Sequence, residues 1–150
     1  PTSIGRAAEE LIAYPIRAQL PGWSIAYEGP RNGYHGNTNT VTRTITVYVD
    51  GGDTPTEIAG VLAHEVGHAI HVTYLDDMAR QRWLDARGLD TSWWPESGGN
   101  DFSLGAGDFA EAIAHIIADS PSDATAGDFT AAQLELAREL LPIPPTQLSG

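Results

Sequence analysis

The sequence predicts an α+β fold, because segments with strand and helix patterns form separate blocks along the chain. A helical segment comes first, short strand-like segments follow before residue 50, and helical segments occupy most of residues 54–140. The 150 residues suffice for one domain with one buried core, and no internal repeat or linker divides them. We therefore expect residues 1–150 to form a single domain.

The first 50 residues combine an interrupted helix with two strands. Residues 3–20 place apolar side chains at helical spacing, and Pro15 is expected to break or kink this helix. Residues 23–27 alternate in polarity, which predicts a short strand. Residues 29–40 are rich in Gly, Asn and Thr and predict a loop or wide hairpin. Residues 42–49 alternate most clearly and predict the second strand.

Helix start signals dominate the rest of the chain. Thr54, followed three residues later by Glu57, is a capping box that predicts a long helix to about Tyr74. Asp77 is expected to cap a second helix that ends near Gly88. After a loop-like stretch, two further helices are predicted, over residues 108–119 and from the capping box Thr130–Gln133.

The motif His64-Glu65-Val66-Gly67-His68 lies inside the long predicted helix. Four residues make about one helical turn, so the two imidazoles share one face and can bind one Zn²⁺. Glu65 is offset around the helix and can reach a water in an open coordination position. Zinc lowers the pKa of such a water towards ~7, and the carboxylate takes its proton during attack on a carbonyl. The motif therefore predicts a zinc hydrolase, against the alternative of two histidines on a surface helix.

Two histidines need a third protein ligand, and the sequence offers two acids on a later helix. Asp108 and Glu111 share a helical face, so one can bind zinc while the other accepts the N–H of a ligand histidine. His71 lies nearly two turns from His64, and a straight helix does not aim both at one ion. We therefore expect His71 at the surface or behind a ligand. Small residues on both helices should permit close packing: Ala63, Gly67, Ala110 and Ala114.

The chain resembles the gluzincin clan of zinc peptidases, which includes thermolysin and anthrax lethal factor. The resemblance rests on His64-Glu65-Val66-Gly67-His68 and on Phe109-Ala110-Glu111, and it extends in order of elements over about residues 40–118. It implies a zincin-like fold, in which a small mixed sheet has its edge strand, here residues 42–49, packed on the motif helix. It also implies a zinc-dependent peptidase whose peptide or protein substrate pairs along that edge strand.

The family's second motif is Glu-x-Phe-Ala-Glu, and this chain departs from it. Gly107 stands at the family's ligand position, and Asp108 follows it directly before Phe109. The resemblance favours Asp108 as the third ligand with Glu111 behind it, because Glu111 matches the family's supporting acid. The alternative is Glu111 as the ligand, with His115 one turn further on.

Catalysis also needs a donor for the developing oxyanion, which is worth about 3–4 kcal/mol in acyl transfer. In lethal-factor-like relatives a tyrosine upstream of the third ligand is a candidate, and the counterpart here is Phe102, which has no hydroxyl. The other candidates are Tyr34, His35, His71 and Tyr74. The departures at Gly107 and Phe102 leave a second hypothesis open, a zinc-binding, catalytically weak or inactive peptidase-like interaction module. A metal-free helical protein is the third.

Composition limits the partners. The chain has 20 acidic residues against 8 basic ones, all Arg, so its net charge of -12 disfavours nucleic acid and anionic membranes. The absence of Cys excludes disulfides and thiolate metal sites, and no apolar run approaches the ~20 residues of a membrane span. The Arg-only, Ala-rich chain is also similar to small secreted zinc peptidase-like proteins of bacteria with GC-rich genomes. We therefore expect a processed, secreted or extracellular monomer.

Overall fold

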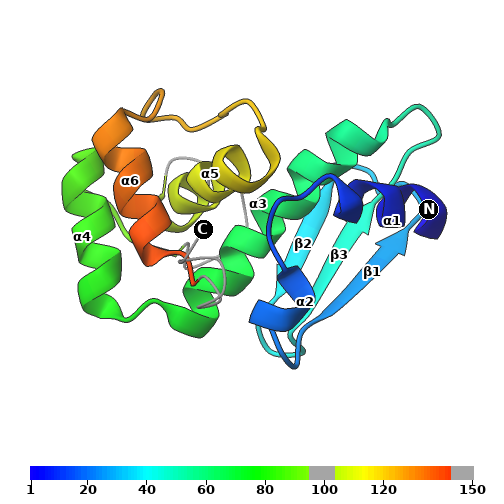
Figure 1. Cartoon of the computed structure of the whole chain (residues 1–150), viewed down its shortest axis with the longest axis horizontal. Helices are drawn as coiled ribbons and strands as arrows, with labels where there is room; N and C mark the ends of the chain where they lie inside the picture. The colour runs from blue at the N-terminus through cyan, green and yellow to red at the C-terminus, as the bar shows by residue number, and fades with distance from the viewer. Residues whose placement is uncertain (95–103, 143–150) are drawn as a thin grey trace.

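The computed structural model of the chain describes residues 1–94 and 104–142, and these ranges form an α+β fold (Figure 1). The predicted order of a helical start, a block of strands and a block of helices is confirmed. The elements are α1 (Thr2–Glu10), α2 (Ile16–Gln19), β1 (Ser24–Glu28), β2 (Gly36–Asn39), β3 (Thr44–Tyr48), α3 (Pro55–Tyr74), α4 (Asp77–Arg87), α5 (Gly105–Ala118) and α6 (Ala131–Leu140).

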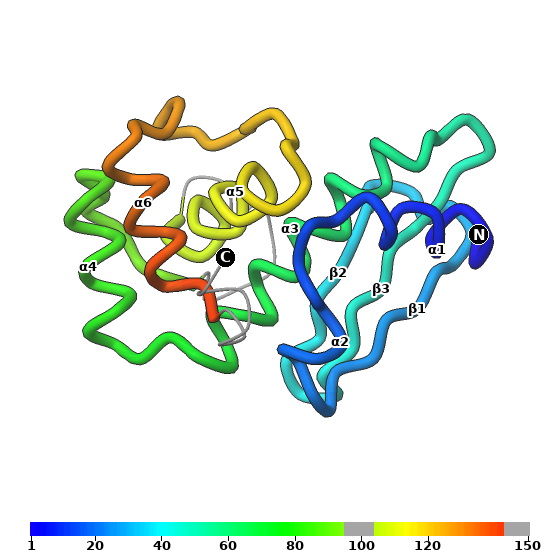
Figure 2. The backbone as a smooth tube through the Cα atoms, viewed as in Figure 1, coloured from blue at the N-terminus to red at the C-terminus, as the bar shows by residue number. Residues whose placement is uncertain are grey.

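The three strands form one mixed sheet in the order β1-β3-β2, and the tube in Figure 2 shows β3 between the other two. β3 runs parallel to β1 and antiparallel to β2, so Ile45 pairs with Ile25 on one side and with Thr38 on the other. The inward side chains of β3, Ile45 and Val47, are fully buried. Because β3 is hydrogen-bonded on both sides, it is the centre of the sheet.

The edge strand beside the motif helix is therefore β2, which corrects two expectations. Residues 29–40, expected as a loop or wide hairpin, contain β2, and residues 42–49, expected as the edge strand, contain the central β3. The residues of β2, Gly-Asn-Thr-Asn, have low strand propensity, so no local pattern marks them. It is a strand because its backbone pairs with that of β3.

Most helix boundaries follow their sequence signals. The capping box of α3 is formed as predicted, with Thr54 accepting from the Glu57 N–H and Glu57 accepting from the Thr54 N–H. α4 ends at Gly88, whose φ of 66° is the left-handed conformation that glycine adopts without strain. The cap of α4 is Asp76 rather than Asp77, because the Asp76 side chain accepts the N–H three residues on.

α3 is the central helix, with the sheet packed on one side and α5 on the other (Figure 1). The helices approach closely at Gly67, where an added Cβ would lie 2.7 Å from the Ala110 Cα. The expected close packing through small residues is thus confirmed at this contact. It brings α5 onto the histidine-bearing middle of α3. In the described ranges, no helix is both long and apolar enough to cross a bilayer.

Candidate metal centre

His64 and His68 lie on one face of α3 with their Nε2 atoms 3.1 Å apart. Two nitrogen ligands at ~2.05 Å from a tetrahedral zinc are about 3.3 Å apart, so this separation fits a shared ion. His68 is 4% exposed, and the His64 side chain is also mostly enclosed. The expected pairing of the two imidazoles one helical turn apart is therefore present in the fold.

Glu111 is the acid that contacts this pair. Its Oε1 lies 2.7 Å from His64 Nδ1, across the α3–α5 interface. Its Oε2 accepts the backbone N–H of Asp123 at 2.9 Å, so both carboxylate oxygens are held. A carboxylate that accepts from Nδ1–H fixes the histidine ring and places the lone pair on Nε2. Glu111 therefore contacts His64 at the ring nitrogen that does not face His68.

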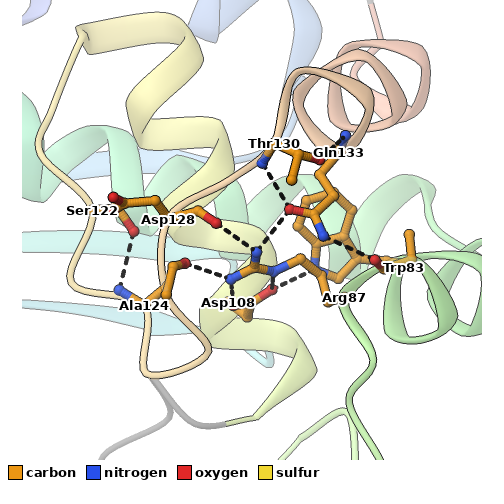
Figure 3. A network of polar contacts seen from close by, with 10 residues as sticks. Trp83, Arg87, Asp108, Ser122, Ala124, Asp128, Thr130 and Gln133 are labelled. Atoms are coloured by element: carbon orange, nitrogen blue, oxygen red, sulfur yellow. Dashed lines mark hydrogen bonds and ion pairs between the residues drawn. The ribbon is translucent and has the colours of Figure 1, made fainter.

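Asp108 lies elsewhere, in a buried ion pair with Arg87 (Figure 3). Arg87 donates to both Asp108 oxygens at 2.8 and 2.9 Å, and the Trp83 indole N–H donates to Oδ2 at 2.9 Å. Arg87 also donates to the side chain of Gln133 and to backbone carbonyls near Asp128, so the cluster ties α4 and α5 to the start of α6. The expectation that Asp108 is the third zinc ligand is therefore not supported, because its oxygens are committed to this cluster.

Glu65 is held between α3 and the edge strand. Its side chain is mostly buried, and its Oε2 accepts a hydrogen bond of 2.5 Å from the Thr38 hydroxyl on β2. Next to it, a Cβ added at Gly36 would lie 2.8 Å from Glu65 Oε1. A larger residue at this position would therefore displace the Glu65 side chain. Neither Thr38 nor Gly36 was singled out from the sequence, since nothing local marks β2 as a strand.

His71 is buried behind His68, with 1% of its surface exposed. Its Nε2 lies 3.0 Å from His68 Nδ1, and its Nδ1 accepts from the Trp93 indole N–H at 3.2 Å. Burial, reinforced by His68 and by Arg80, lowers the pKa of His71 to about 2, so the ring is neutral. The expected surface position is therefore wrong, and His71 lies behind His68, the candidate ligand.

The remaining candidates are not brought to the histidine pair. Tyr34 is exposed and packs against Arg31, while the Tyr74 hydroxyl donates to the Gln19 carbonyl. His35 lines a pocket of about 260 Å³ beside the first turns of α3. Phe102 lies outside the described residues. In residues 1–94 and 104–142, no oxyanion donor is therefore assigned.

A third protein ligand is also not found within the described ranges, where no group of three His, Cys, Asp or Glu side chains has a metal-binding arrangement. Within these ranges the candidate site consists of two histidines whose Nε2 atoms lie 3.1 Å apart, with Glu111 on His64 Nδ1, His71 on His68 Nδ1, and Glu65 next to His64 in the chain. Comparison of the chain with protein-family models, with curated proteins and with solved structures gives no match.

Proposed function

We propose that the chain is a zinc-dependent endopeptidase of the zincin type, in which His64 and His68 hold the metal and Glu65 is the general base. The observation that carries this proposal is the 3.1 Å separation of the two Nε2 atoms on a rigid, capped helix. Bound there, zinc would supply Lewis acidity, which activates a water and polarises a peptide carbonyl.

Glu65 is suited to remove a proton because its carboxylate is enclosed but has a fixed orientation. The Thr38 hydroxyl holds one oxygen, and the close passage of Gly36 limits where the other can lie. Glu65 adjoins His64 in the chain, so its carboxylate and the metal ligands belong to the same turn of α3. A base fixed in this way takes a proton without first reorganising, which is the condition for efficient acid–base catalysis.

Glu111 completes the proposed site from the other side of α3. It accepts from His64 Nδ1 and so keeps the Nε2 lone pair of that ring directed to the metal position. This assignment keeps the expected role of Glu111 as the supporting acid and does not keep Asp108 as the ligand. It leaves the third ligand unassigned among the described residues.

The substrate proposed is a peptide or protein in extended form. β2 is the edge of the three-stranded sheet and passes directly beside Glu65, so a strand added along β2 would bring its backbone to the base. The net charge of -12 disfavours anionic polymers. We also propose a secreted location, which the resemblance to small secreted peptidases implies.

A second candidate function is zinc binding with little or no hydrolysis. It is favoured by Gly107, which offers no side chain one turn before Glu111, and by the commitment of Asp108 to Arg87. A site with two histidine ligands binds metal less firmly and orients substrate less well than a site with three. The two candidates agree on the metal and differ on turnover.

The deciding experiment measures zinc content and peptide hydrolysis of the wild type and of Glu65→Gln. The peptidase proposal predicts about one zinc in both proteins and a loss of hydrolysis of about 10²–10⁴-fold in the variant. Glu135→Gln is the matched control, since the Glu135 carboxylate on α6 is exposed. Hydrolysis that survives in Glu65→Gln contradicts the mechanism. Zinc bound without turnover on broad peptide libraries favours the second candidate.

A further inference from the structure

A continuous line of hydrogen bonds connects Trp93 to Glu111 through three imidazoles. The contacts are Trp93 Nε1 to His71 Nδ1 at 3.2 Å, His71 Nε2 to His68 Nδ1 at 3.0 Å, His68 Nε2 to His64 Nε2 at 3.1 Å, and His64 Nδ1 to Glu111 Oε1 at 2.7 Å. The line crosses the candidate metal centre, because its middle contact joins the two proposed ligand atoms. The positions of the hydrogens along it therefore bear on metal binding.

The Trp93 end fixes the direction of donation. An indole N–H can only donate, so the Nδ1 of His71 must accept. Since Nδ1 accepts, the ring hydrogen of His71 is on Nε2. That hydrogen is donated to the Nδ1 of His68. A His68 ring that accepts at Nδ1 carries its own hydrogen on Nε2.

The two proposed ligands therefore start in different states. His64 donates from Nδ1 to Glu111, so its Nε2 carries a lone pair rather than a hydrogen. His68 presents N–H at the same place, directed at His64. A metal ligand needs the lone pair, so His68 must change tautomer before it can bind.

That change cannot stop at His68. When its hydrogen moves from Nε2 to Nδ1, the Nε2 of His71 must become an acceptor, and the His71 hydrogen must move to Nδ1. The His71 Nδ1–H then points at the Trp93 N–H, so two donors face each other and no hydrogen bond can form between them. The protein loses no proton in this rearrangement, but the Trp93–His71 hydrogen bond is broken.

Trp93 is not free to turn away from this conflict. Its carbonyl accepts the N–H of Ala106 at 2.8 Å, at the start of α5. Its ring packs so closely on Gly105 that an added Cβ there would lie 2.6 Å from the ring. Phe109 and the guanidinium of Arg80 lie against the same indole. The indole N–H is therefore held towards His71 by contacts that do not depend on the metal.

We propose that the Trp93 N–H acts through His71 as a latch that holds His68 in the tautomer that cannot bind metal. The inference rests on the proposed use of His64 and His68 as zinc ligands. Zinc binding must break the Trp93–His71 hydrogen bond, and the free energy of that bond is subtracted from the free energy of binding. The zinc affinity is therefore lower than it would be without the Trp93 N–H. Trp93 and His71 are positioning residues here, and neither is a proposed ligand.

The test compares zinc affinity in the wild type, Trp93→Phe and Trp94→Phe, by competition with a chromophoric chelator. Trp93→Phe keeps an aromatic ring and removes the donor, so zinc should bind about fivefold to tenfold more tightly. Trp94→Phe is the matched control, because the Trp94 ring centroid lies 4.9 Å from that of His71, against 5.4 Å for Trp93, but Trp94 donates no hydrogen bond to His71. Its zinc affinity should remain that of the wild type.

The histidine tautomers of the metal-free protein give a second readout, by long-range ¹H–¹⁵N NMR. In the wild type His68 should carry its hydrogen on Nε2, and a hydrogen on Nδ1 overturns the latch whether or not Trp93→Phe folds. Equal or weaker zinc binding by folded Trp93→Phe also overturns the latch and leaves the proposed function intact. Zinc binding by none of the three proteins overturns the metal site and the latch together.

Discussion

The Thr38 hydroxyl donates a 2.5 Å hydrogen bond to Glu65 Oε2 and so joins the edge strand β2 to the proposed catalytic base on α3. The same hydroxyl also lies 3.2 Å from the Glu65 carbonyl oxygen. Two contacts with one residue leave the hydroxyl little rotational freedom. The carboxylate is therefore positioned by a strand that a substrate peptide would pair with, which links substrate binding to the geometry of the base.

Replacing Thr38 tests this link. Thr38→Val keeps the shape of the side chain and removes the donor, so kcat for peptide hydrolysis should fall about fivefold, as one hydrogen bond is worth about 1 kcal/mol. Thr38→Ser keeps the hydroxyl and should retain most of the activity. Zinc content should stay at the wild-type value in both. A Thr38→Val enzyme with unchanged kcat would show that the hydroxyl does not orient Glu65 during turnover.

Gly36 provides a steric test of the same carboxylate. In Gly36→Ala the new Cβ would lie 2.8 Å from Oε1 and 2.9 Å from Cγ of Glu65, so the side chain must move. A misplacement of about 1 Å can cost up to about 10²-fold in rate, and we expect hydrolysis to fall at least about tenfold. Gly29→Ala is the control, because nothing lies within 4 Å of the Cβ added there. Equal rates in the two variants would contradict the proposed contact.

Asp108 should matter for stability rather than for metal binding. Asp108→Asn leaves Arg87 buried with its charge uncompensated, which should lower the free energy of unfolding by about 3–5 kcal/mol in urea titrations. The zinc content of the folded variant should be unchanged. Glu139→Gln breaks the exposed pair with Arg82 and should cost no more than about 1 kcal/mol. A variant that no longer binds zinc but keeps the wild-type free energy of unfolding would instead indicate that Asp108 is a zinc ligand.

The helices with local signals were predictable from the sequence. Thr54 and Thr130 begin α3 and α6 as expected, because a capping box needs only residues three apart. β2 was missed for the opposite reason. Its Gly and Asn residues disfavour a strand, and what makes it one is pairing with β3, a contact that no short pattern encodes.

The candidate site divides in the same way. The pairing of His64 with His68 follows from helical periodicity, which the sequence shows directly. The choice between Asp108 and Glu111 does not, because both share one face of α5 and only their distant partners separate them. Asp108 forms an ion pair with Arg87, which lies 21 residues away in the chain. Glu111 contacts His64 because α5 packs on α3. Such long-range pairing is invisible to spacing within one helix.

Glu111 should support zinc binding without being essential for it. Glu111→Gln keeps the size of the side chain but removes the charge that favours His64 Nδ1–H, so zinc affinity should fall about 10–100-fold. Isothermal titration with zinc measures the change, and Glu135→Gln again serves as the exposed control. Complete loss of zinc at millimolar concentrations would instead indicate that Glu111 is itself a ligand. Unchanged affinity would remove it from the site.

His71 should make the metal-free protein less stable in acid. Burial lowers its folded-state pKa from the usual 6.5 to about 2, so the unfolded chain binds its proton first. Stability from this group is therefore complete above about pH 6.5 and is lost as the pH falls below that value. Between pH 7.5 and 5.0 the loss from one such histidine is about 2 kcal/mol.

The measurement is urea unfolding with a chelator at these two pH values, for the wild type, His71→Gln and His35→Gln. The amide of Gln can accept from Trp93 and donate to His68, but it does not titrate, so His71→Gln should lose about 2 kcal/mol less than the wild type. His35 is exposed directly before β2, and its replacement should leave the wild-type loss in place. Equal losses in the wild type and His71→Gln would mean that the pKa of His71 is not lowered in the folded protein, which contradicts its burial as a neutral acceptor towards Trp93.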